Sequence, residues 1–261
     1  MIFFIHIPKT AGTTFYEVVK KNHAQFIKLK PELVSNTNFT TINEDCAIRL
    51  SGGYSSAPQN LKSILTAKKN DHIKFIGGHV GYGFHEEIEN DVTYISFIRD
   101  PKSRILSDYG EHCKPGRHFF DLLSANNFDI NYYLELVLND GLDNIMTRQI
   151  AGPYDFYLKN RTMVDDNLFA KACSNVNSIT FFDFENFDEA LIYLANEVKW
   201  NRLAYERKNV SKTRNTSPLN IDNNLLDKVI HYDLKLFNAI KVVNEKKMSK
   251  LENLLFKLKT W

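Results

Sequence analysis

The stretch that decides the fold is MIFFIHIPKTAGTT, residues 1–14. Its first half is apolar, β-branched and aromatic, which predicts a buried strand over residues 2–7. A loop over 8–13 follows, and an amphipathic pattern predicts a helix over 14–24. The first N–H groups of a helix have no partner within it, and the helix dipole favours an anion there. The stretch therefore predicts a phosphate site built from Lys9, Thr10, Ala11, Gly12, Thr13 and Thr14.

The order of residues in this loop differs from that of the common nucleotide-binding loop. The Walker pattern places its lysine directly after the last glycine. Here Lys9 precedes Gly12, the only glycine of the loop, and no Gly-Lys-Ser/Thr occurs nearby. We also find no strand that ends in an obvious magnesium-binding aspartate paired with a lysine of the Walker type. A kinase or NTPase is therefore an alternative rather than the leading hypothesis.

A second anion site is predicted at the end of the strand over residues 93–98. Arg99 follows that strand, at the edge where open α/β sheets bind ligands. Asp100 is a good N-cap and Pro101 suits the first position of a helix, which we expect over 101–112. Ser107 lies about two turns into that helix. A guanidinium and a hydroxyl so placed could hold one phosphate, although an Arg–Asp surface pair and an ordinary helical serine would show the same pattern.

Together, HIPKTAGTT and the Arg99–Ser107 segment resemble the sulfotransferases of the heparan sulfate 2-O-, 6-O- and uronyl group (the Sulfotransfer_2 type), including bacterial members. The resemblance implies a P-loop-like fold and 3′-phosphoadenosine-5′-phosphosulfate (PAPS) as the donor. It implies that the loop after the first strand holds the 5′-phosphosulfate, and that Arg99 and Ser107 hold the 3′-phosphate. It also implies a carbohydrate hydroxyl as acceptor and no metal.

The resemblance extends along most of the chain. In Gly78-His79-Val80 it implies that His79 is the base that deprotonates the acceptor. In Asn144-Ile145-Met146-Thr147-Arg148 it implies that Asn144 and Arg148 lie near donor and acceptor. Asn209–Thr213 resembles a late loop that closes over the nucleotide, which adds Lys212 and Thr213 to the donor site. Residues 31–71 match no motif and are expected to shape the acceptor side.

The residue types suit the implied chemistry. An imidazole with a pKa near ~6.5 is poised to accept a proton at neutral pH, which fits His79. A lysine in the donor loop, Lys9, can neutralise charge on the leaving phosphate. Tyr82 and His85 are further candidates for the acceptor side, although Tyr82 could be a core residue and His85 the solvated start of a helix. His6 lies in the first predicted strand and is expected to be a core residue.

Composition sets the outer limits. The 261 residues are 43% hydrophobic and 25% charged, with a net charge of +2, which is ordinary for a globular protein and no signature of nucleic-acid binding. The three cysteines form neither a C-x-x-C pair nor a zinc spacing, which favours a reducing compartment. No signal peptide and no 18-residue apolar stretch is evident. We therefore expect a cytoplasmic, bacterial-type enzyme without a membrane span, or else a piece of an anchored one. Its oligomeric state is not predicted.

The remaining elements complete an α/β pattern in a single domain over 1–261. Strands are expected at 73–77 and 178–183, and residues 25–60 are read as a polar loop, followed by a short helix near 60–69. Helices are expected at 117–125, 129–139, 142–150, 164–175, 186–197 and 222–258, the last broken near Glu245, with a loop over 205–221. Strands alternating with helices predict a parallel sheet with helices on both faces and a helix-rich C-terminal half. A non-catalytic nucleotide- or glycan-binding protein with this fold is a third hypothesis.

Overall fold

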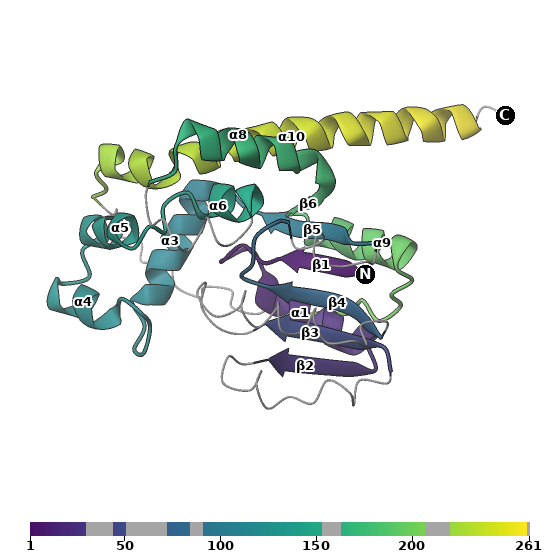
Figure 1. The fold of residues 1–261 in the computed structure, drawn as a ribbon, viewed down its shortest axis with the longest axis horizontal. Helices are drawn as coiled ribbons and strands as arrows, with labels where there is room; N and C mark the ends of the chain where they lie inside the picture. The colour runs from purple at the N-terminus through teal and green to yellow at the C-terminus, as the bar shows by residue number, and fades with distance from the viewer. Residues whose placement is uncertain (30–43, 51–71, 84–90, 153–162, 207–219, 260–261) are drawn as a thin grey trace.

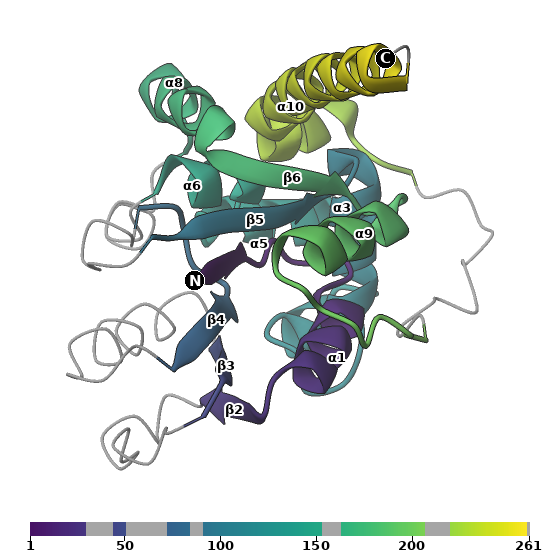
Figure 2. The ribbon, with the colours of Figure 1, turned by 90° about the vertical axis from the view of Figure 1, so that its right-hand side faces the viewer.

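The computed structural model describes residues 1–29, 44–50, 72–83, 91–152, 163–206 and 220–259, with the side chains given up to residue 244. Its strands form one parallel sheet in the order β2-β3-β4-β1-β5-β6. Their bounds are β1 (Ile2–Ile5), β2 (Gln25–Leu29), β3 (Cys46–Leu50), β4 (Ile73–Gly78), β5 (Thr93–Ile98) and β6 (Ile179–Asp183). Figure 2 shows these strands side by side along the sheet.

Helices connect the strands and make up most of the second half of the chain (Figure 1). They are α1 (Gly12–Asn22), α3 (Pro101–His112), α4 (Phe120–Ala125), α5 (Ile130–Asn139), α6 (Ile145–Ala151), α8 (Asp166–Asn175), the short 3₁₀ helix η4 (Val176–Ser178), α9 (Phe187–Glu197) and α10 (Asn223–Lys259). In the described residues, none of these helices is long and apolar enough to cross a bilayer.

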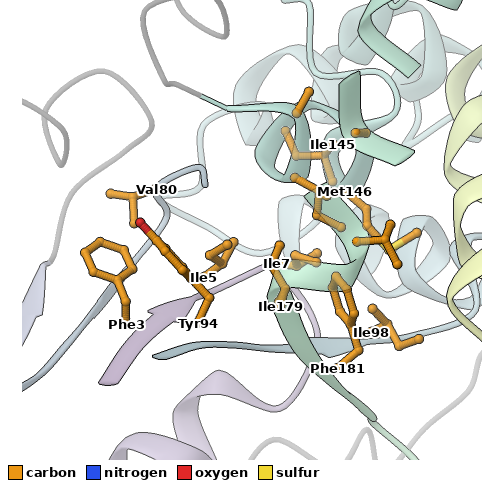
Figure 3. Close-up of a cluster of buried hydrophobic side chains, with 14 of the residues drawn as sticks. Phe3, Ile5, Ile7, Val80, Tyr94, Ile98, Ile145, Met146, Ile179 and Phe181 are labelled. Atoms are coloured by element: carbon orange, nitrogen blue, oxygen red, sulfur yellow. The ribbon is translucent and has the colours of Figure 1, made fainter. Parts of the chain in front are cut away.

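Alternating residues of β1 belong to two separate cores, one on each face of the sheet. Phe3 and Ile5 pack in the cluster that α6, α8 and α10 complete, part of which Figure 3 shows. Phe4 packs in the other cluster, with residues of α1 and α9. Because successive side chains of a strand point to opposite faces, helices cover both faces of the sheet. The predicted fold class is therefore confirmed.

A third cluster joins the helices beyond the sheet. Ile105 of α3, Tyr133 and Leu134 of α5, and Val229 and Ile230 of α10 are all buried together. This packing fixes α3, which begins shortly after β5, against the first turns of α10. The start of α3 is consequently a rigid support for the residues that precede it.

Several predicted elements need correction. Residues 25–29 and 46–50 are strands β2 and β3, not loop, and they form one edge of the sheet. The predicted break near Glu245 is wrong, because α10 runs without interruption from Asn223 to Lys259. The first strand ends at Ile5 and α1 begins at Gly12, two residues from each predicted boundary. The helix predicted at 60–69 lies outside the described residues.

Candidate functional site

Three neighbouring strands bring the predicted site residues to the same edge of the sheet. β1 pairs with β4 so that Ile5 faces Gly78, and His6 and His79 follow these two residues directly. On its other side, β1 pairs with β5, which ends one residue before Arg99. The carboxyl ends of parallel strands are where α/β proteins bind ligands. The loop after β1 therefore lies between the histidine of β4 and the arginine of β5.

The β1–α1 loop has the backbone geometry of an anion site. Lys9 and Ala11 both have positive φ, at 68° and 64°, and α1 begins at the next residue, Gly12. Left-handed residues alternating with helical ones turn successive N–H groups into one concavity. Ala11 is the N-cap and has no side-chain acceptor for the first amides of α1. By contrast, the carboxylate of Asp100 caps α3 by accepting from the Ser103 amide at 2.7 Å.

The polar residues of the loop divide into structural and accessible ones. The Thr10 hydroxyl is buried and donates to the carbonyl oxygen of Ile7 at 2.7 Å, so it shapes the loop. Thr13 is exposed, whereas Thr14 is buried in the first turn of α1. Lys9 is partly exposed, and its Nζ lies 3.3 Å from a carboxylate oxygen of Glu111 in the last turn of α3. Among these side chains, Lys9 and Thr13 are the ones most accessible to a ligand.

Gly12 is required by its contact with His6. A Cβ atom at position 12 would lie 1.9 Å from Nε2 of His6, well inside any permitted contact. The His6 ring thus packs directly against the backbone of the loop. His6 is buried, as predicted, but it lies between the loop and His79 rather than in a remote part of the core.

His79 is held by its neighbour across the β1–β4 pair. Its Nδ1 donates to the carbonyl oxygen of His6 at 2.8 Å, and the two imidazole rings stack with centroids 4.4 Å apart. Gln149 of α6 donates to the same carbonyl at 3.2 Å. Because a carbonyl can only accept, Nδ1 of His79 carries a proton, and the lone pair of the neutral ring is on Nε2. This is the tautomer that a general base requires.

The electrostatic environment keeps both histidines neutral. Burial is the main cause that lowers the pKa of His6 well below its usual value, and the positive charges of His79 when it is protonated, of Arg49 and of Lys9 act in the same direction. Burial also lowers the pKa of His79, an effect that its hydrogen bond to His6 and the charge of Asp108 oppose and that of Arg49 reinforces. At neutral pH the His79 ring is therefore neutral, with its one proton on Nδ1.

Arg99 joins the two predicted anion sites. Its Nη1 donates to the carbonyl oxygen of Lys9 at 3.2 Å, and its guanidinium lies over the Phe184 ring, 4.6 Å from the centroid. Phe184 comes directly after β6, so the stack fixes the guanidinium beside the end of β5. Ser107 is half-buried in the middle of α3. The Lys9 loop and the Arg99 corner are thus in direct contact.

Asn144 and Arg148 lie in the interior, each about 1% exposed. The Asn144 side chain accepts from the amides of Tyr232 and Asp233 in α10, at 2.8 and 3.1 Å. Arg148 pairs with the Asp143 carboxylate at 2.5 Å. Side chains so enclosed do not line an open site, so these contacts do not support the prediction that they bind the acceptor. Instead, they tie α6 to α10 and to the segment before α6.

The other predicted residues are placed only in part. Tyr82 is half-buried, its ring lies 4.7 Å from that of Tyr94, and its amide donates to the Gln149 carbonyl at 2.8 Å. It therefore packs at the border of the core that contains β5. His85, Lys212 and Thr213 lie outside the described residues. Their roles remain predictions.

Reasoning from the sequence missed three residues of this site. Arg49 lies in β3, within the stretch that the sequence predicts as loop. Its guanidinium lies 4.3 Å from the centroid of the Tyr16 ring. Glu111 lies twelve residues beyond Arg99 on the predicted helix, with no local signal that it faces Lys9. Gln149 lies within the predicted helix over 142–150, next to Arg148, and is not among the predicted site residues. The short apolar run Cys46-Ala47-Ile48, followed by Arg49 and Leu50, is a weak signal that could have placed Arg49 near the end of a strand.

Comparison with known proteins agrees with this geometry. A search of curated proteins finds no match to the chain. A model of the family described as "Sulfotransferase family" matches residues 1–238, which include every strand of the sheet, the β1–α1 loop and the start of α10. Because that match spans most of the chain, the protein belongs to the sulfotransferase family.

Proposed function

We propose that this protein transfers a sulfuryl group from PAPS to a hydroxyl of a carbohydrate acceptor. The observation that carries the proposal is the direct contact between the two cationic segments, Arg99 Nη1 to the Lys9 carbonyl oxygen at 3.2 Å. A donor with phosphates at both ends of one nucleoside needs two anion sites that are close to each other. Membership of the sulfotransferase family supports the same donor class.

The residues at the sheet edge suit such a donor. The β1–α1 loop offers backbone amides at a helix amino end that no N-cap side chain occupies, together with the ammonium of Lys9. We assign the phosphosulfate to this loop. Arg99 and Ser107, at the β5–α3 junction, are assigned to the 3′-phosphate. The charge-assisted hydrogen bonds of a guanidinium to phosphate are about twice as strong as neutral ones.

The chain's own residues provide the acid–base chemistry. In an in-line displacement, the acceptor oxygen forms a bond to sulfur as the bond from sulfur to the phosphate oxygen breaks. The acceptor's proton passes to Nε2 of His79, whose Nδ1 is already hydrogen-bonded to the His6 carbonyl. Lys9 and the amides of the loop stabilise the charge that develops on the leaving phosphate.

Binding of the desulfated product tests the donor assignment. Calorimetry should show that 3′-phosphoadenosine-5′-phosphate binds without magnesium. Arg99→Ala should weaken this binding by about 10- to 100-fold, because a hydrogen bond to a charged group contributes about 1.5–3 kcal/mol. Arg202→Ala, which removes an exposed guanidinium bonded to the Lys21 carbonyl, is the matched control and should bind normally. Absence of binding, combined with tight binding of Mg-ATP, would instead favour a kinase or NTPase.

The acid side of the pH–rate profile tests His79 as the base. Since its pKa is lowered, mainly by burial and further by Arg49, kcat/KM should stay high below the usual titration range of histidine and fall only at more acid pH. Arg49→Met removes a positive charge near His6 and His79 and so raises the pKa of His79. The acid limb of the profile should therefore shift to higher pH. The other charged group that acts on His79, Asp108, opposes Arg49 and is unchanged in the variant.

Two further variants separate charge from packing. Arg49→Lys keeps the charge while altering the contact with the Tyr16 ring, so its acid limb should stay close to that of the parent enzyme. Lys20→Met removes an exposed cation from α1 and should leave the profile in place. An acid limb that does not move in Arg49→Met would contradict the assignment of this limb to His79.

A further inference from the structure

Glu111 is the partner of three cations at the rim of the site. Its Oε2 lies 3.3 Å from Nζ of Lys9 and 2.6 Å from Nζ of Lys114, and its Oε1 pairs with Nη2 of Arg117. Lys9 comes from the β1–α1 loop, whereas Lys114 and Arg117 come from the segment that follows α3. One carboxylate thus connects the proposed donor loop to the far end of the helix that begins at the Arg99 corner.

The charges in this cluster do not balance. Three cations around one carboxylate leave an excess of two positive charges, so an anion that arrives at Lys9 enters a favourable field. Burial opposes ionisation of Glu111, but Lys114, Lys9 and Arg117 outweigh that effect and lower its pKa. Glu111 is therefore an anion at neutral pH and competes with any phosphate or sulfate for the Lys9 ammonium.

The four charged side chains of this cluster differ in how far they are exposed to solvent. The side chains of Lys114 and Arg117 are 60% and 53% exposed, against 22% for Lys9 and 23% for Glu111. Exposed ion pairs contribute at most about fivefold in an equilibrium constant, and the Lys9–Glu111 pair, which is less exposed, lies at the upper end of this range. Lys9 can leave Glu111 because Lys114 and Arg117 stay paired with the carboxylate when it does.

From this arrangement, we propose that Glu111 is a positioning residue that holds Lys9 when the donor site is empty and releases it to the donor's 5′ end. Lys114 and Arg117 weaken the hold of Glu111 on Lys9 by sharing the carboxylate. The inference rests on the proposed function, because it assigns Lys9 a phosphate or phosphosulfate as its second partner. Glu111 touches neither donor nor acceptor and acts only through Lys9.

The inference is tested by measuring the affinity for 3′-phosphoadenosine-5′-phosphate in a double-mutant cycle. Glu111→Gln removes the competing carboxylate and should tighten binding by up to about fivefold, consistent with one lost ion pair. In a Lys9→Ala background the same change should have almost no effect. An equal gain in both backgrounds would mean that Glu111 acts by long-range repulsion, and would overturn the inference.

Arg117 provides a second cycle with the opposite sign. Arg117→Gln leaves more of the Glu111 carboxylate to Lys9, so it should weaken binding of the nucleotide more in the parent protein than in Glu111→Gln, where the loss of its charge is all that remains. An equal weakening in both backgrounds would show that Arg117 acts by its charge or by contact with the nucleotide and not through Glu111, which contradicts the inference. Circular dichroism and thermal melts of each variant report whether these partly exposed positions leave the fold intact.

The outcomes also separate this inference from the proposed function. If the parent protein does not bind 3′-phosphoadenosine-5′-phosphate, the donor assignment fails, and the role of Glu111 fails with it because Lys9 then has no second partner. If the parent binds it and Lys9→Ala weakens binding, but neither cycle shows coupling, the donor assignment stands and the role of Glu111 is refuted.

Discussion

His79→Ala is expected to lower kcat by about 10²–10⁴-fold while the protein stays folded, because this is the usual contribution of a general base. The ring is half-buried directly after β4, and its Nδ1 donates to the His6 carbonyl oxygen. Removing it leaves the donor loop and Arg99 in place. We therefore expect the affinity for 3′-phosphoadenosine-5′-phosphate, measured by calorimetry, to change little while turnover of labelled donor with a glycan panel collapses.

The chain contains a matched control for this variant. His72 lies directly before β4 and His79 directly after it, so the two histidines lie at opposite ends of the same strand. His72 is exposed, and its backbone carbonyl accepts from the Cys46 amide, a bond that alanine would keep. His72→Ala should have the activity of the parent enzyme. Full activity of His79→Ala would refute the role of His79 as the base.

Asp143→Ala is expected to destabilise the fold by about 3–5 kcal/mol, the cost of leaving a buried charge without its partner. Asp143 and Arg148 have side chains 0% and 1% exposed, and the Asp143 carboxylate also accepts from the amide of Val164 at 3.1 Å. Its loss removes the carboxylate that pairs with the enclosed Arg148 guanidinium. Urea denaturation, followed by circular dichroism, measures the change in the free energy of unfolding.

Two comparisons make this result specific. Asp227→Ala removes an exposed carboxylate from α10 and should change stability by less than about 0.5 kcal/mol. Replacing Asp143 and Arg148 together by leucine and methionine should cost much less than Asp143→Ala, because no isolated charge remains. A change below 1 kcal/mol in Asp143→Ala would contradict the view that this ion pair ties α6 to the protein interior.

Local signals in the sequence predicted much of the fold. The helix over 101–112 matches α3 to the residue, because an N-cap at Asp100 and a proline at the first helical position mark its start. The strand over 93–98 likewise matches β5, whose run of alternating and apolar residues is long. Where capping and patterning are both strong, sequence and structure agree.

The edge of the sheet was not predictable in the same way. β2 and β3 are five residues each and carry Lys28 and Arg49, so their apolar pattern is short and interrupted. They are strands because they pair with each other and with β4, a non-local interaction that no single segment encodes. Missing β3 also meant missing Arg49, the cation that acts on both histidines.

The site was predicted in part for a related reason. Lys9, His79 and Arg99 lie at the ends of strands, which a strand-to-loop pattern reveals. The packing of His6 on His79, 73 residues away, depends on the register of β1 with β4. Asn144 and Arg148 are predicted as ligand-binding residues by the resemblance of Asn144-Ile145-Met146-Thr147-Arg148 to a sulfotransferase segment. Their partners in α10 and at Asp143, and hence their burial, become apparent only in three dimensions.

The contact between Gly12 and the His6 ring restricts how this protein can change. Any side chain at position 12 would collide with that ring, so a larger residue there requires a smaller one at position 6. A smaller residue at position 6 would, however, remove the ring on which His79 stacks. The loop proposed to hold the donor and the imidazole proposed as the base therefore both pack against the His6 ring. A substitution that alters one of these two parts requires a compensating change in the other.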